Sequence, residues 1–140
     1  MTDDATIRRV LELPGTWAVV GWSPRPDRPS HGVAAFLEQT GHPVVRVNPN
    51  VDTSKVPGVE VVPSLDLVDG PVSVVDVFRR SSEAGRVIDQ AVTVGARAVW
   101  LQLGVFDDAA TERARRAGLD VVVDRCPRIE HPRVFGRQGR

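Results

Sequence analysis

The chain has 140 residues, which is enough for one domain with a single sizeable core. Its 18 Lys and Arg residues balance its 18 Asp and Glu residues, so nothing in the overall charge calls for a nucleic-acid or membrane partner. The single cysteine excludes an internal disulfide and a zinc site built from thiols, and it fits a cytoplasmic protein.

The apolar pattern predicts helices and strands that alternate along the chain. Helices are predicted where apolar residues recur every three or four positions, and strands are predicted from short, continuous apolar runs. The expected helices cover residues 4–12, 30–40, 81–94 and 107–117, and the expected main strands cover 17–21, 44–47, 72–77, 98–103 and 121–123.

Two stretches have a weaker pattern. Residues 50–71 are rich in proline and glycine, and within them we predict a short strand at 59–62 and one helical turn at 64–67. From Pro127 onward the chain shows little pattern. We therefore predict a single domain over 1–140, with its core at about 5–132 and a tail at 133–140.

Continuous apolar strands that alternate with helices are typical of a parallel sheet covered on both faces. The predicted fold class is α/β, with a Rossmann-like, doubly wound, parallel five-stranded sheet in the order 3-2-1-4-5. Ligands of such sheets bind at the carboxyl ends of the strands. The loops after Val20, Val47, Val77 and Leu103 are expected to meet there.

Residues 17–32 read WAVVGWSPRPDRPSHG. This segment predicts the first strand, a glycine turn and the start of a helix. Free N–H groups and the helix dipole make such a helix start a phosphate site. Ser23 is a candidate phosphate donor, Arg25 and Arg28 are candidate cations, and Ser30 is the predicted N-cap. His31 lies in the first turn of this helix, where it either contacts phosphate or stays in solvent.

The dinucleotide fingerprint is incomplete. G-x-G-x-x-G needs three glycines, and this chain keeps only Gly21. The second strand ends in Asn48-Pro49, without the carboxylate that would accept the ribose hydroxyls. Asn48 with Arg28 or Lys55 suits a phosphorylated ribose instead, as in NADP or coenzyme A (CoA), and the long proline-rich loop favours CoA.

Five segments carry a family resemblance: WAVVGWSPRPDRPSHGVAAFL, VVRVNPN, VSVVDVFRR, AVWLQLGV and DVVVDRCPRIEH. They resemble the small stand-alone CoA-binding proteins of bacteria and, more distantly, the N-terminal CoA-binding domain of the succinyl-CoA synthetase alpha subunit. The resemblance covers about residues 5–132 and implies a Rossmann-like fold. The chain has no counterpart of the synthetase's second domain, so its reaction is not carried over.

The resemblance implies coenzyme A or an acyl-CoA as ligand. The first loop would face the phosphates, Asn48 and Pro49 would lie beside the nucleotide, and the ends of the third and fourth main strands would line the adenine and pantetheine path. The expected cofactor-binding residues are Gly21, Trp22, Ser23, Pro24, Arg25, Arg28, Ser30, His31, Asn48, Pro49, Val77, Phe78, Arg79, Leu101, Gln102 and Leu103.

Charged residues near the third main strand are assigned structural roles. Asp76 is predicted to form an ion pair, because a buried unpaired carboxylate is costly. Of Arg79 and Arg80, at least one is expected to face the cleft, while the other pairs with Asp76 or Asp124.

The tryptophans and the cysteine are the remaining candidates. Trp17 and Trp100 are predicted to pack in the core, whereas Trp22 in the loop is expected to cover part of the ligand. Cys126 is either an inert buried thiol or a thiol activated by Arg125, which would form a mixed disulfide with the CoA thiol.

The sequence contains no Ser-His-Asp order, metal set or paired acid–base carboxylates. The leading hypothesis is therefore a CoA-binding module without catalytic groups of its own. The alternatives are a partner-dependent enzyme subunit that acts on acyl-CoA and an NADP-binding redox or sensor domain. A homo-oligomer or a protein partner is left open.

Overall fold

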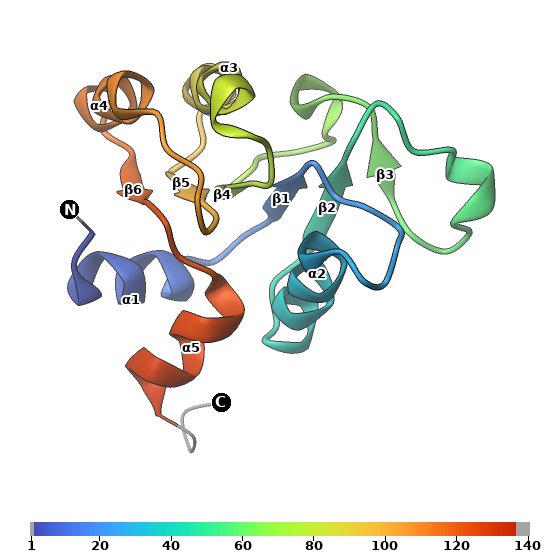
Figure 1. The fold of residues 1–140 in the computed structure, drawn as a ribbon, viewed down its shortest axis with the longest axis horizontal. Coiled ribbons are helices and arrows are strands. Elements are labelled where there is room, and N and C mark those ends of the chain that lie inside the picture. The colour runs from blue at the N-terminus through green and yellow to red at the C-terminus, as the bar shows by residue number, and fades with distance from the viewer. Residues whose placement is uncertain (1, 137–140) are drawn as a thin grey trace.

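The computed structural model describes residues 2–136 of the chain, which form an α/β domain with one central sheet (Figure 1). The strands are β1 (Trp17–Val20), β2 (Val44–Val47), β3 (Val61–Val62), β4 (Val74–Val77), β5 (Ala98–Leu101) and β6 (Asp120–Val122). The helices are α1 (Asp4–Glu12), α2 (Pro29–Gln39), α3 (Ser81–Thr93), α4 (Asp108–Arg116) and α5 (Pro127–Phe135), with 3₁₀ turns at Thr53–Lys55 (η1) and Leu65–Leu67 (η2).

The six strands pair in parallel in the order β3-β2-β1-β4-β5-β6. The predicted doubly wound parallel sheet is confirmed, with one strand more than the five predicted. The extra strand is the short segment expected within 59–62, which pairs with β2 at the edge of the sheet. It is only two residues long and ends before Pro63.

Helices cover both faces of the sheet (Figure 1). Helices α1, α2 and α5 lie on one face, and α3 and α4 lie on the other. Side chains in each strand alternate between the faces, so that Trp17 and Val19 pack with the first group of helices and Ala18 and Val20 with the second. Both sets are buried, which explains why the strands are continuous apolar runs. Trp17 and Trp100 are fully buried core residues, as predicted.

The C-terminal segment that shows little sequence pattern forms a helix, α5. The sequence analysis missed it because Pro132 lies inside the helix and its apolar periodicity is weak. Arg133 anchors it instead, since its guanidinium donates to the carboxylates of Asp4 in α1 and Glu130 in α5 at 2.6–3.0 Å. Residues 133–135 therefore belong to a helix and not to the predicted tail, whose last four residues lie outside the described range.

The turn after β1 requires glycine. Gly21 has a φ of +91°, and a Cβ at this position would lie 2.1 Å from the carbonyl oxygen of Phe78, the first residue after β4. The Gly21 N–H also donates to the carbonyl of Val47 at 2.8 Å, at the end of β2. This one residue therefore joins the carboxyl ends of three adjacent strands.

We predict that Gly21→Ala lowers the free energy of unfolding by about 3 kcal/mol or more, because left-handed strain adds to a clash with backbone. Gly41→Ala is the matched control. Gly41 has a φ of +96°, and a Cβ at this position would meet nothing within 4 Å. That variant should lose only about 1–2 kcal/mol, the cost of the conformation alone. Urea denaturation measures both, and equal losses would contradict the close approach.

Candidate functional site

The direction of winding reverses between the adjacent strands β1 and β4. The chain leaves β1 towards α2 on one face and leaves β4 towards α3 on the other, which leaves a crevice at their carboxyl ends. A cavity of about 280 Å³ lies there. Its lining comes from the ends of β1 and β2 with the turns after them, from the loop after β3, from the link between β4 and α3, and from α3: Val20, Gly21, Val47, Pro49, Pro63, Ser64, Leu65, Arg79, Arg86, Val87 and Gln90.

The charge in this cavity has one sign. Two guanidinium groups, those of Arg79 and Arg86, line it and no carboxylate does. Arg79 forms an ion pair with Glu83, one turn along α3, whereas Arg86 has no ion-pair partner within the described part of the chain. The cavity is therefore suited to an anionic group.

The N-terminus of α2 lies on the other side of the Gly21 turn, and it is also electropositive. Its N-cap, Arg28, makes no side-chain capping bond, and its first turn contains no acidic residue. By contrast, Asp3 caps α1 and Asp107 caps α4 through their carboxylates. An uncapped helix N-terminus beside a glycine turn is the usual arrangement of a phosphate site.

The loop between β1 and α2 is held in place by its two serines. The N–H of Ser23 donates to Ser30 Oγ at 2.9 Å, and Ser23 Oγ accepts from the N–H of Arg25 at 3.2 Å. The Ser23 hydroxyl keeps its own hydrogen for a ligand. The prediction of Ser30 as N-cap is wrong, because Pro29 begins the helix and Arg28, two residues before Ser30, is the N-cap.

Trp22 does not cover the site with its ring. Its side chain is only 2% exposed and lies 5.8 Å from the half-buried ring of His31, near the guanidinium of Arg46. The left-handed Gly21 interrupts the alternation of β1, and Trp22 packs in the same cluster as Trp17 and Val19, on the α2 side of the sheet. The expected role of Trp22 as an aromatic cover is therefore wrong, and the loop contributes Ser23 and backbone groups instead.

The loop after β2, the second loop expected at the site, uses part of its polar groups for hydrogen bonds within the protein. The Asn48 amide donates to the carbonyl of Trp22 at 2.8 Å and accepts from the N–H of Asn50 at 2.9 Å, so it ties the two loops together. Pro49 follows it and lines the cavity. Arg28 and Lys55, the cations expected nearby, are both exposed.

The remaining expected residues divide between the core and the surface. Val77 and Leu101 are fully buried, so their side chains cannot line a ligand path. Phe78 packs against the core, whereas Leu103 is 57% exposed. In the first loop, Pro24 and Arg25 are exposed, and Arg25 pairs with Asp27 at 3.1 Å.

Sequence reasoning missed two groups of cavity residues. Pro63, Ser64 and Leu65 come from the irregular stretch before β4, where no motif marks them. Arg86 and Gln90 come from α3. Their spacing of four residues places them on one helix face beside Val87, and this spacing was the available signal.

Comparison with known proteins identifies the family. The model of the CoA binding domain family matches residues 15–132. The chain belongs to this family. This agrees with the resemblance drawn from the five sequence segments.

Individual relatives have similar lengths. YneT of Bacillus subtilis (strain 168) is 35% identical over 127 residues, which are 91% of this chain and 93% of YneT. Prb, the PH1109 protein redesigned for binding, is 34% identical, with a TM-score of 0.90 over 98% of this chain and 95% of Prb. A hypothetical protein from Pyrococcus horikoshii OT3 is 33% identical, with a TM-score of 0.88 over 96% of this chain and 94% of that protein.

Other chemistry is sparse in residues 2–136. They contain no cluster of three or more His, Cys, Asp or Glu residues placed to hold a metal ion, and no helix among them is long and apolar enough to cross a membrane.

Cys126 is buried beside Trp100 and Val122, which favours the inert interpretation of this thiol. Arg80 pairs with Glu83, so the prediction that one of the two arginines after β4 binds Asp76 or Asp124 is wrong.

Asp76 is fully buried in β4, between Val19 and Trp100 of the neighbouring strands. The predicted ion pair is wrong, because no cation in the described range approaches this carboxylate. The side-chain amide of Gln102 lies within hydrogen-bond distance of it, at 2.8 Å from Oδ1 and 3.3 Å from Oδ2. Burial raises the pKa of the Asp76 carboxyl well above its usual value. Gln102, one of the expected ligand contacts, is thus occupied beneath the site.

We predict that Asp76→Asn removes a pH dependence of stability. A carboxyl whose folded-state pKa is raised stabilises the fold fully below its unfolded pKa, about 4, and this contribution is lost as pH rises through the folded value. The free energy of unfolding of wild type minus that of the variant should therefore fall above pH 4, by at most about 1.4 kcal/mol per pH unit. Denaturation curves from pH 4 to 8 measure it.

The control is Asp66→Asn, which removes one exposed carboxylate and should follow wild type at every pH. A constant difference between wild type and Asp76→Asn across this range would show that Asp76 does not gain protons on folding.

Proposed function

We propose that this protein binds coenzyme A or an acyl-CoA in the crevice between β1 and β4. The observation that carries the proposal is the pair of electropositive features on either side of the Gly21 turn. One is the uncapped N-terminus of α2, and the other is the cavity that contains Arg79 and Arg86 without a carboxylate. Membership of the CoA-binding domain family supports the identity of the ligand.

Each feature suits one part of the ligand. The pyrophosphate sits at the N-terminus of α2, with the Ser23 hydroxyl and the exposed Arg25 and Arg28 beside it. The 3′-phosphorylated adenosine occupies the cavity, where Arg79 and Arg86 neutralise the phosphate. Pro49, Pro63 and Leu65 give this cavity apolar walls for the adenine.

The protein recognises the carrier and supplies no catalytic groups of its own in this proposal. Asp76, the one carboxyl group of β4, is fully buried beside Gln102, which removes it from contact with a ligand. A partner-dependent enzyme is the second candidate. It predicts turnover of an acyl-CoA only in the presence of another protein.

We predict that Arg86→Gln weakens CoA binding about tenfold, because it removes one charge-assisted hydrogen bond to phosphate. Arg97→Gln is the control. It removes the same charge from an exposed arginine at the opposite, amino edge of β5 and should leave the affinity unchanged. Titration calorimetry at fixed salt measures both variants, and equal affinities would remove Arg86 from the site.

A ligand panel separates CoA from the nucleotide alternative. CoA should raise the melting temperature of the protein, and dephospho-CoA should raise it less, because it lacks the 3′-phosphate that the guanidiniums of Arg79 and Arg86 would bind. NAD should have no effect. A shift with NADP and none with CoA would support the redox or sensor interpretation, and acyl-CoA turnover by the isolated chain would overturn the binding-module proposal.

A further inference from the structure

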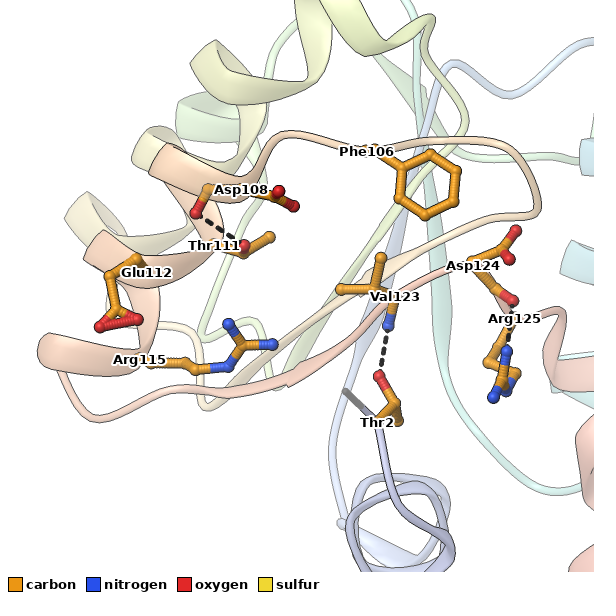
Figure 2. A pocket seen from close by; sticks show the side chains of 9 residues that line it. All are labelled: Thr2, Phe106, Asp108, Thr111, Glu112, Arg115, Val123, Asp124 and Arg125. Atoms are coloured by element: carbon orange, nitrogen blue, oxygen red, sulfur yellow. Dashed lines mark hydrogen bonds between the residues drawn. The ribbon is translucent and has the colours of Figure 1, made fainter.

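A second and larger cavity, of about 540 Å³, lies at the same edge of the sheet, beyond β6 (Figure 2). It lies alongside α4 and is closed by the segment that follows β6 and by the N-terminal Thr2, whose hydroxyl accepts from the N–H of Val123. Its lining residues are Thr2, Phe106, Asp108, Thr111, Glu112, Arg115, Val123, Asp124 and Arg125.

We infer that this cavity receives the acyl group of an acyl-CoA, and that it prefers an uncharged acyl group to an anionic one. The inference rests on the proposed function, because the acyl group reaches the cavity only if the nucleotide end is bound between β1 and β4. It names the class of thioester, which the family match leaves open.

An apolar wall is held exposed at the entrance. Phe106 is 49% exposed and Leu103 is 57% exposed, both in the loop between β5 and α4. This loop is fixed at two points, since the N–H of Phe106 donates to Ser81 Oγ at 2.9 Å and the N–H of Gly104 donates to Asp124 Oδ1 at 2.8 Å. Apolar side chains held in solvent by a fixed loop are typical of a binding surface.

Asp124 is the residue that fixes this loop to β6, and its backbone is strained. Its φ of +61° is the only positive φ of a non-glycine residue within 2–136. Such a conformation costs about 1–3 kcal/mol and is concentrated at functional sites. Here it directs the carboxylate towards Gly104, which keeps the Phe106 loop in place beside the cavity.

The distance along the sheet suits the pantetheine arm. From β1 to β6 the order is β1-β4-β5-β6, which is three strand spacings or about 14 Å. The arm has about 13 bonds between the phosphorus and the sulfur, and at about 1.1–1.2 Å of advance per bond it spans roughly 14–16 Å when extended. An arm that starts at the α2 N-terminus and follows this edge brings the thioester to Phe106.

The charge of the cavity disfavours an anion. Asp108, Glu112 and Asp124 line it against the two guanidiniums of Arg115 and Arg125. The N-terminus of α4 beside it is already capped by a carboxylate, unlike that of α2. A second carboxylate on the acyl group would meet this excess of negative charge, whereas a methyl end would lie against the ring of Phe106.

Calorimetry with CoA, butyryl-CoA and succinyl-CoA tests the inference. The two acyl groups have equal carbon chains and differ in one carboxylate. We expect butyryl-CoA to bind about tenfold more tightly than CoA, because its propyl group leaves water, and succinyl-CoA to bind no more tightly than CoA. In Phe106→Ala, the preference for butyryl-CoA should disappear while the affinity for CoA stays unchanged.

The control variant is Leu67→Ala, which truncates an equally exposed apolar side chain in η2, away from this cavity. It should leave the ratio of butyryl-CoA to CoA affinity unchanged. Equal affinities of wild type for CoA and butyryl-CoA would overturn the inference and leave the proposed function standing. Binding of neither ligand would overturn both.

Discussion

The close approach of β1 to the chain leaving β4 is the constraint on which the site depends. The backbone at Gly21 lies so near the carbonyl of Phe78 that there is no room for a Cβ. Because Gly21 also bonds to the end of β2, the ends of three strands converge at one point. The two loops that leave this point run to opposite faces of the sheet, and the space between them is the crevice.

The chain has zero net charge, but its ion pairs are placed so that the crevice between β1 and β4 keeps an excess of positive charge. Many arginines are neutralised at other places, as Arg46 is by Glu38 and Arg133 is by Asp4 and Glu130. Around the crevice the acidic partners are fewer, and Arg86 faces the cavity with none in the described range. The local excess of guanidinium, and not the overall composition, gives this crevice its positive charge.

The carboxyl edge of the sheet is divided by charge along its length. The β1 side is positive and begins at an open helix N-terminus, whereas the β6 side holds more carboxylates than guanidiniums and begins at a capped one. Between them, Asp76 and Gln102 form a buried polar pair in which burial favours the protonated carboxyl. A ligand that is anionic at one end and uncharged at the other matches this division.

The sequence by itself determined the parallel fold, since buried strands between helices must be apolar throughout, and it located the loop between β1 and α2, since a glycine must end β1 before a helix. It also indicated the ligand family through five ordered segments. Tertiary structure decided which side chains face the site. Trp22 turned inward because α2 covers it, and Ser30 bonded to Ser23 because Pro29 took the helix start. Arg86 and α5 were missed because their roles depend on contacts between distant segments, which no local pattern records.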